Sequence, residues 1–299
     1  MRVFVTGASG WIGSAAVDEL LAAGHEVTGL ARSDASAAAV EAKGAHVRRG
    51  DLDDLESIRA GAEAADAVVH LANKHDFADP AVSNAAERGA VQTIGDALAG
   101  SNRPFLLASG VVGLAHGRPA VETDRSPFHG PESPRGGSEN LALEFADRGV
   151  RTVSLRFAPT VHGAGDHGFI SVIAGIAREK GVSGYPGAGT NRWAAVHRSD
   201  AGRLVALALE KAPAGSRLHA VAEEGVPTRE IAEAIGRTFD LPVVSIDPGD
   251  VADHFGWIGR YFAMEGATSS AATQALLGWT PTGPGLVEDI DTGAYSAVG

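Results

Sequence analysis

The chain has 299 residues, of which 44% are hydrophobic and 21% charged, as in an ordinary globular protein of one large domain or slightly more. Its formal net charge of −12, without a basic run, argues against nucleic-acid binding, which needs clustered Lys and Arg. Cysteine is absent, which excludes disulfides and cysteine nucleophiles, and no apolar run approaches the roughly 20 residues of a membrane span.

The first stretch of the chain has the pattern of strand, glycine turn and helix. An apolar run over residues 3–5 leads into Thr6-Gly-x-x-Gly-x-x-Gly13, and an Ala-rich amphipathic segment follows over residues 14–23. A dinucleotide diphosphate binds at such a helix N-terminus, where free N–H groups favour anions and glycine lets the backbone approach closely. The motif therefore predicts a dinucleotide site. Because the strand starts at residue 3, we expect no signal peptide and a cytoplasmic protein.

The next elements alternate between strand and helix. We expect strands over residues 26–30, 46–48, 67–71, 105–108 and 152–156, and helices over residues 35–43, 53–59, 80–100 and 136–148. Short strands joined by helical crossovers predict an α/β fold, a Rossmann doubly wound parallel sheet with both faces covered.

This rhythm changes after Pro159. Strands are expected over residues 192–196 and 218–221, with a helix between them that Asp200 caps, and helical pieces broken by prolines follow Glu223. We expect a nucleotide-binding core from residues 1–160, completed by 190–222. Residues 161–189 and 223–299 are expected to form a smaller C-terminal substrate-binding lobe.

Further motifs follow the glycine turn in a fixed order: Gly50-Asp-Leu52, His70-Leu-Ala-Asn73, Ala108-Ser-Gly110, Leu155-Arg-Phe-Ala-Pro-Thr-Val-His-Gly163, Trp193-x-x-Val-His-x-x-Asp200 and Leu277-Gly-Trp-Thr-Pro281. This set resembles the extended and atypical short-chain dehydrogenases/reductases, the NAD(P)-dependent epimerase/dehydratase group. The resemblance covers nearly the whole chain. It is specific for the fold and less specific for the reaction, because function depends on sites that vary within a fold.

The end of the second strand points to NADP as the cofactor. An NAD site has a carboxylate there for the ribose 2′-hydroxyl, whereas Arg32 offers a guanidinium to a 2′-phosphate and Ser33 adds a hydroxyl. By resemblance, Asp51 also contacts adenine, although it suits a turn cap equally well. The expected cofactor-binding residues are Gly7, Ser9, Gly10, Trp11, Ile12, Gly13, Arg32, Ser33, Asp51, Leu52, Leu71, Ala72, Asn73, Pro159 and Val161, the last seven of them from the resemblance.

The proton-transfer pair of the family is missing from this sequence. The resemblance implies Tyr-x-x-x-Lys on the helix after the fifth strand, but the matching stretch is Arg135-Gly-Gly-Ser-Glu139. None of the three tyrosines is followed four residues later by Lys. Two alternatives remain open: Arg135 polarises a carbonyl or holds a substrate anion with Glu139 as its i,i+4 partner, or the two form a solvated surface pair.

Other polar residues are candidates for the missing proton donor. Ser109 matches the family's serine at the end of the fifth strand, where its hydroxyl faces the ligand crevice, unless it caps a turn. His75 follows the fourth strand and titrates near neutral pH, unless it is a simple loop residue. We therefore expect catalysis from Ser109, Arg135 and His75.

The residues of the smaller lobe suggest the class of substrate. The expected substrate residues are His162, Phe169, Tyr185, Trp193 and Trp257, although His162 also suits a turn cap and aromatic residues often form core. No metal-ligand spacing is present. We expect an NADPH-dependent reductase of a small carbonyl or imine. The alternatives are a nucleotide-sugar epimerase or dehydratase and a non-catalytic NADP-sensing protein. The resemblance implies a homodimer through the helices near residues 81–98 and 136–148.

Overall fold

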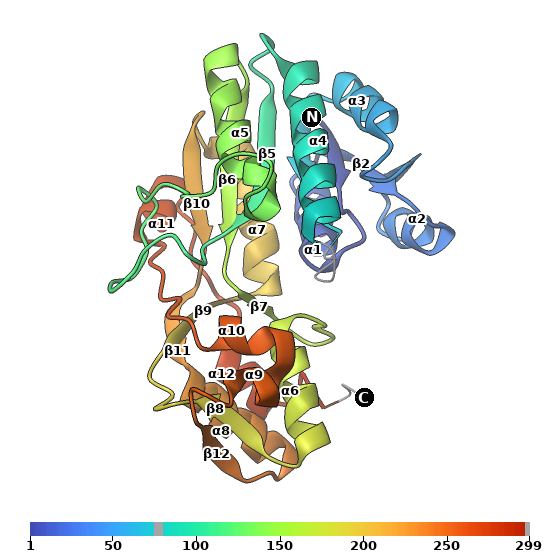
Figure 1. Ribbon diagram of the computed structural model, residues 1–299. Helices are drawn as coiled ribbons and strands as arrows, with labels where there is room; N and C mark the ends of the chain where they lie inside the picture. Colours follow the sequence, from blue (N-terminus) through green and yellow to red (C-terminus); the bar gives the residue numbers. More distant parts are fainter. Residues whose placement is uncertain (75–79, 297–299) are drawn as a thin grey trace.

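A seven-stranded sheet dominates the computed structural model, which describes residues 1–74 and 80–296 (Figure 1). The strand order is β10-β6-β5-β4-β1-β2-β3, and every neighbouring pair is parallel. The strands are β1 (Arg2–Thr6), β2 (Glu26–Ala31), β3 (His46–Arg49), β4 (Ala67–His70), β5 (Pro104–Gly110), β6 (Arg151–Phe157) and β10 (Ser216–Ala220). The predicted Rossmann doubly wound sheet is confirmed.

Helices cover both faces of this sheet because side chains alternate along each strand. Val3 and Val5 contribute to one buried cluster, and Phe4 contributes to the other. The first face is covered by α1 (Trp11–Ala22), α2 (Asp34–Glu41) and α7 (Arg198–Lys211), and the second by α3 (Leu55–Ala64), α4 (Pro80–Leu98), α5 (Ser138–Glu144) and the flanking turns η1 (Pro134–Gly137) and η2 (Phe145–Arg148).

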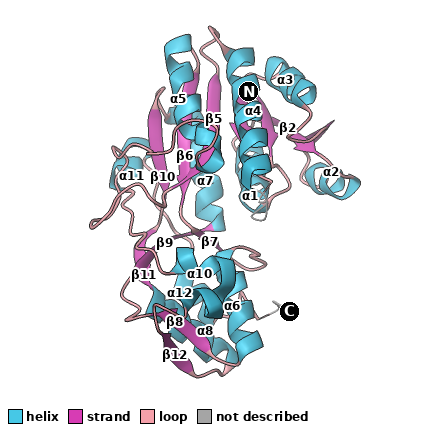
Figure 2. Ribbon diagram, in the orientation of Figure 1, coloured by secondary structure: helices cyan, strands magenta, loops and turns pink. Residues whose placement is uncertain are grey.

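The smaller lobe lies below the carboxyl ends of the strands (Figures 1 and 2). Its buried cluster includes Ile170, Trp193, Ile235 and Phe262. One three-stranded sheet has the order β11-β9-β7, and a two-stranded sheet pairs β12 with β8. Its elements are β7 (Thr160–His162), α6 (Phe169–Lys180), β8 (Ser183–Pro186), β9 (Arg192–His197), β11 (Glu223–Pro227), α8 (Thr228–Phe239), β12 (Val243–Ile246), α9 (Val251–Phe255), η3 (Gly256–Ile258), α10 (Gly259–Phe262) and α12 (Leu286–Asp291).

One helix late in the chain packs on the large sheet and not on the smaller lobe. Leu277 at the end of α11 (Ala271–Leu277), together with Trp279, is buried in the cluster that also contains residues of α7 and β10. Residues 223–299, which the sequence assigns to the substrate lobe, therefore include a segment that completes the core of the large lobe. In the described parts of the chain, no helix is long and apolar enough to cross a membrane.

Candidate active site

The glycine turn leaves the N-terminus of α1 open to an anion. Gly10 is the N-cap without a side-chain cap, and the first turn contains no acidic residue, so the first N–H groups of α1 have no carboxylate against them. Gly7 has a φ of 71°, and a Cβ on Gly13 would lie 1.9 Å from the Gly7 carbonyl oxygen, so the turn closes only around glycine. Ser9 and Gly10 are exposed. This arrangement fits the diphosphate of a dinucleotide.

Trp11 links this turn to the segment that follows β6. Its indole Nε1 donates to the Val161 carbonyl at 2.7 Å. The Arg198 guanidinium lies 4.3 Å from the Trp11 ring centroid and donates to the Trp11 carbonyl and the Ser14 hydroxyl. A Cβ on Gly7 would in turn lie 2.7 Å from the Ala72 nitrogen. The glycine turn, the end of β4 and the segment around Val161 therefore meet at one place.

The end of β2 presents an arginine that no acidic residue neutralises. Arg32 is exposed and makes no hydrogen bond or ion pair with any residue that the structure describes. Ser33 caps α2, accepting from the Ser36 N–H at 3.2 Å. Arg49 at the end of β3 donates to the Asp34 carboxylate at 2.8 Å. The nearest acid in sequence is therefore paired with Arg49, and Arg32 remains available to a ligand.

The residues after β3 also have structural roles. Asp51 Oδ1 accepts from the N–H groups of Asp53 and Asp54 at 2.9 and 3.1 Å. Asp51 therefore caps a turn, the role that the sequence suited as well as contact with adenine. Leu52 is buried in the cluster between the sheet and α3 and α4. Both residues lie at the carboxyl end of β3, on the edge of the sheet that also holds Arg32 at the end of β2.

The sequence led us to expect that Arg135 pairs with Glu139, but in the structure Arg135 has another partner. Arg135, Gly136 and the following glycine have left-handed φ values of 56°, 60° and 64°, so Arg135 precedes the helix and does not share a face with Glu139. Its Nε and Nη2 instead donate to Glu87 Oε1 of α4 at 2.9 and 2.6 Å. The alternative of a solvated surface pair is also wrong, because Glu87 and Glu139 are 1% and 6% exposed.

Glu87 connects Arg135 to the end of β4. Asn73, three residues after β4, donates through Nδ2 to Glu87 Oε2 at 2.5 Å. Burial raises the pKa of Glu87, while Arg135 opposes this shift. Burial, with a smaller effect of Arg135, lowers the pKa of His70 to about 3, so His70 is neutral where it contacts the Thr6 hydroxyl. Arg135 keeps 37% of its side chain exposed, and its Nη1 makes no hydrogen bond to the described part of the chain.

Ser109 belongs to a second network at the carboxyl end of the sheet. Ser109, Arg156 and His219 occupy one row across β5, β6 and β10. Ser109 Oγ donates to Glu139 Oε2 at 3.0 Å, while Arg156 Nε donates to Oε1 at 2.7 Å and Nη2 lies 2.7 Å from the same oxygen. Arg156 Nη1 lies 2.9 Å from the Asp124 carbonyl and 3.3 Å from His219 Nε2. The half-buried Ser109 is thus hydrogen-bonded to Glu139, which belongs to a buried network with Arg156 and His219.

The expected substrate residues are not all in one place. Trp193 is 2% exposed and packs against Phe169 and Phe262, so it is a core residue and the expectation that it lines a pocket is wrong. Tyr185 lies on β8, which Figure 1 shows on the side of the lobe away from the large sheet. Phe169 and Trp257 are in edge contact with ring centroids 5.8 Å apart, and Trp257 is 44% exposed.

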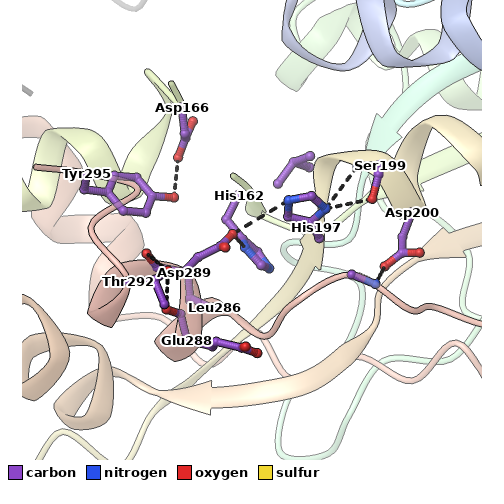
Figure 3. Close-up of polar contacts among 12 residues, drawn as sticks. His162, Asp166, His197, Ser199, Asp200, Leu286, Glu288, Asp289, Thr292 and Tyr295 are labelled. Carbon is purple, nitrogen blue, oxygen red and sulfur yellow. Dashed lines mark hydrogen bonds and ion pairs between the residues drawn. The ribbon is translucent and has the colours of Figure 1, made fainter. Parts of the chain in front are cut away.

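His162 is buried in a polar cluster, whose contacts Figure 3 shows, so the expectation that it lines a pocket is not met. It is 1% exposed, and its Nδ1 lies 2.6 Å from Asp289 Oδ2 on α12. Close by, the Tyr295 hydroxyl donates to Asp166 Oδ2 at 2.8 Å, and burial raises the pKa of both groups. We call His162, Asp166, Asp289 and Tyr295 the C-terminal clasp. Its hydrogen bonds connect β7 and the residues just after it to α12 and the last described residues of the chain.

The start of α7 also differs from the expectation. His197 is the N-cap, and its Nδ1 accepts from the Ser199 N–H at 3.3 Å. Asp200, expected as the cap, is fully buried within the first turn and accepts from the N–H groups of Thr282 and Gly283 (Figure 3). Both residues therefore have structural roles.

His75, the third expected catalytic residue, lies outside the described residues. Within the described residues, no group of three or more His, Asp or Glu side chains could hold a metal ion.

Sequence reasoning missed three residues that organise the site. Glu87 occupies the buried face of α4 with Val91 and Ile94, four and seven residues later, and a charge on an apolar helix face was a readable signal. Arg156 and His219 stand in strands of a sheet covered on both faces, where a polar side chain needs a buried partner. The sequence did not indicate which partner each residue has.

The doubly wound parallel sheet and the open N-terminus of α1 form the arrangement that binds dinucleotides in Rossmann folds. The model of the NAD dependent epimerase/dehydratase family matches residues 3–221, and the chain belongs to this family. An uncharacterized protein of Schizosaccharomyces pombe is 44% identical over 295 residues, covering 99% of this chain and 100% of that protein. A 4-hydroxy-2-methyl-3-oxo-4-farnesyl-3,4-dihydroquinoline-1-oxide ketoreductase of Stigmatella aurantiaca is 29% identical over 223 residues, covering 72% and 66%.

Solved structures share the fold at lower sequence identity. The UDP-glucose 4-epimerase of Thermotoga maritima superposes with a TM-score of 0.78 at 19% identity, covering 99% of this chain and 98% of that one. The dTDP-glucose 4,6-dehydratase DesIV of Streptomyces venezuelae, with NAD bound, gives a TM-score of 0.78 at 21% identity, covering 98% and 96%. These similarities establish the fold, and the reaction has to be argued from the site.

Proposed function

We propose that the protein is an NADPH-dependent reductase of a small carbonyl or imine. The observation that carries the proposal is that two anchored polar side chains, Arg135 and Ser109, belong to the carboxyl ends of the neighbouring strands β4 and β5. Arg135 is bonded to Glu87, which also accepts from Asn73 after β4, and Ser109 of β5 is bonded to Glu139. A guanidinium aimed at a developing oxyanion stabilises it, and a serine hydroxyl contacts the same heteroatom. NADPH, when bound, supplies the hydride.

The chain's own residues would hold this cofactor at three points. The glycine turn and the N-terminus of α1 receive the diphosphate, and Arg32 receives the 2′-phosphate. Leu71 to Asn73 and Pro159 to Val161, which follow the carboxyl ends of β4 and β6, would line the nicotinamide half. The similarity to a ketoreductase supports reduction, although the solved neighbours cited above are an epimerase and a dehydratase. The preference for NADP rests on Arg32 and on the pairing of Asp34 with Arg49.

Arg32→Ala tests the cofactor assignment. Loss of a charge-assisted contact of about 1.5–3 kcal/mol should raise the Kd for NADPH roughly 10- to 100-fold, and binding of NADH should barely change. NADPH fluorescence titration measures both constants. Arg237→Ala removes another exposed guanidinium, on α8 of the smaller lobe, and should leave both affinities as they are. Equal affinity of the wild-type protein for NAD and NADP would contradict the assignment.

Arg135→Ala tests the site of chemistry. Removing an oxyanion-stabilising donor typically lowers kcat by about 10²–10³-fold, and the affinity for NADPH should be retained. NADPH oxidation with a broad panel of carbonyls and imines gives the measurement. Arg88→Ala, which removes a donor to the Gly136 carbonyl of the same turn, controls for displacement of the turn. A variant that keeps wild-type turnover would remove Arg135 from the mechanism.

A nucleotide-sugar epimerase or dehydratase is the second candidate, favoured by the shared fold of the solved neighbours. Two of the arginines that a sugar-nucleotide diphosphate could use are already engaged, since Arg192 pairs with Glu265 and Arg198 packs on Trp11. Purified protein that carries non-exchanging NAD would favour this candidate. If no carbonyl or imine oxidises NADPH, a sensing role gains support. Sedimentation tests the proposed homodimer through α4 and α5.

A further inference from the structure

We propose that Ser109 acts toward the substrate only as a hydrogen-bond acceptor, and that it thereby selects a carbonyl compound with a nearby hydroxyl group, as in an α-hydroxyketone. This selection rests on the proposed reductase function and defines the substrate class of the same site. The hydroxyl, and not the carbonyl oxygen, is the substrate group that contacts Ser109, because a carbonyl oxygen has no hydrogen to donate.

The atoms behind Ser109 fix the direction of each hydrogen bond. The Ser269 carbonyl only accepts, so His219 Nδ1, which lies 2.8 Å from it, carries the ring hydrogen. Burial lowers the pKa of His219, so the ring is neutral and its Nε2 accepts from Arg156 Nη1 at 3.3 Å. Arg156 has only donors, and its Nε donates to Glu139 Oε1 at 2.7 Å. Glu139 is therefore the carboxylate of a buried ion pair and has no hydrogen to give.

The hydroxyl hydrogen of Ser109 is committed to this carboxylate. Ser109 Oγ donates to Glu139 Oε2 at 3.0 Å, and no other residue of the described chain donates to Oε2. Glu139 is 6% exposed, so water has little access to that oxygen. Turning the serine hydrogen toward a ligand would leave a buried carboxylate oxygen without its donor, which is costly. Ser109 therefore keeps its hydrogen on Glu139 when a ligand binds.

The lone pairs of Ser109 remain for the ligand. Ser109 is half-buried at the carboxyl end of β5, and none of the residues that the structure describes donates to its Oγ. A substrate hydroxyl that donates to Oγ extends the series of donors that ends at Glu139, and hydrogen bonds aligned in one direction strengthen one another. An ether or carbonyl oxygen would instead bring its lone pairs against those of Oγ. Ser109 thus accepts from an O–H group and disfavours oxygens without hydrogen.

Arg135 provides the complementary contact for the carbonyl oxygen. A guanidinium has donors and no acceptor, so the two anchored side chains require opposite partners: a lone pair at Arg135 and a hydrogen at Ser109. An α-hydroxyketone carries both on adjacent carbons. An α-aminoketone fits less well, because its ammonium group would add a second positive charge to a site that already contains Arg135.

Matched ketones test the acceptor role of Ser109. Hydroxyacetone and butanone differ by a hydroxyl in place of a methyl group, and phenacyl alcohol and propiophenone repeat this pair in a larger molecule. Each ratio of kcat/KM is compared with the same ratio in Ser109→Ala, which corrects for the different reactivities of the carbonyls. We expect the preference for the hydroxyketone to be about 10- to 100-fold greater in wild type than in Ser109→Ala, because the variant has no acceptor for the hydroxyl.

Glu139→Gln should reverse the polarity of Ser109. Arg156 only donates, so the amide oxygen of the glutamine faces Arg156 and its NH2 group donates to Ser109 Oγ. The serine hydrogen is then free to turn toward the substrate. Methoxyacetone and methyl propyl ketone, which differ by an ether oxygen in place of a methylene, measure this change. The preference for methoxyacetone should rise about tenfold over wild type, a gain that structural damage alone would not produce.

Two variants keep this test decisive. Glu122→Gln neutralises another carboxylate beside the network, one that accepts from the Thr273 hydroxyl at 2.7 Å, and it should keep all the wild-type ratios. Ser109→Ala removes a single hydroxyl from a half-buried strand end, so it supplies a result even if Glu139→Gln does not fold.

The outcomes separate substrate selection from the reductase function itself. If the hydroxyketone preference is the same in wild type and Ser109→Ala, or if wild type reduces other carbonyls but neither hydroxyketone, the acceptor role is overturned and the reductase function stands. A Ser109→Ala variant that loses butanone as completely as hydroxyacetone, or a folded Glu139→Gln variant without the gain for methoxyacetone, also overturns it. If wild type oxidises NADPH with no carbonyl or imine of the panel, both proposals fall together.

Discussion

Replacing Arg156 by methionine should lower the free energy of unfolding by about 3–5 kcal/mol, because it leaves the Glu139 carboxylate buried without a counter-charge. Arg156 is 0% exposed, and its loss also removes the donors to the Asp124 carbonyl and to His219 Nε2. Urea unfolding followed by tryptophan fluorescence gives the change, provided that the m-value is unchanged. A loss below about 1 kcal/mol would mean that water or another cation reaches Glu139.

The double variant Arg156→Met, Glu139→Leu is the matched control for this prediction. Removing both members of a buried ion pair is often neutral, so the double variant should recover more than half of the loss. Its turnover should nevertheless be lost, because no carboxylate then positions Ser109. Stability and turnover would thus separate: the pair matters little for the fold as a whole and greatly for the reaction.

Gly13→Ala should abolish tight cofactor binding and destabilise the large lobe. The added Cβ would lie 1.9 Å from the Gly7 carbonyl oxygen and 2.8 Å from the Gly7 carbonyl carbon, so α1 must move away from the turn. Overpacking of this kind costs about 1–3 kcal/mol or more, and displacement of the N–H groups should weaken NADPH binding at least about tenfold. Thermal unfolding with and without NADPH measures both effects.

Gly175→Ala is the control for that substitution. Gly175 lies inside α6, and a Cβ there would meet no atom within 4 Å. Alanine should therefore stabilise the helix by about 0.5–1 kcal/mol and leave NADPH binding as it is. If Gly13→Ala behaved like Gly175→Ala, the tight closure of the glycine turn would not be needed for the cofactor.

The sequence predicted the large sheet well because its signals are local. Each strand is a short apolar run and each helix an amphipathic segment, and the glycine motif stands between the first strand and the first helix. The aromatic residues were less informative, since composition does not distinguish a buried indole from a pocket wall. Trp193 is buried in the core, whereas Trp257 on η3, which contacts the same Phe169 ring, is 44% exposed.

The turn η1 before α5 shows where local reasoning fails. The spacing of Arg135 and Glu139 suggests a shared helix face only if the backbone between them is helical. Two consecutive glycines, Gly136 and Gly137, were a warning, and a Cβ on Gly136 would lie 2.6 Å from the Asn84 carbonyl of α4. The left-handed φ of Arg135 itself has no sequence signal. The choice of Glu87 as its partner depends on packing between elements that are distant in the chain.

The C-terminal clasp determines when the molecule can be completed during synthesis. His162 and Asp289 are 127 positions apart, and Asp166 and Tyr295 are 129 apart. The segment around β7 contacts Trp11 next to the glycine turn. It cannot form the hydrogen bonds of the C-terminal clasp until almost the whole chain has left the ribosome. The large sheet can pair six of its strands by Phe157, well before that point. A nascent chain thus has a long interval in which these six strands are present while α7, β10, α11 and the C-terminal clasp are still missing.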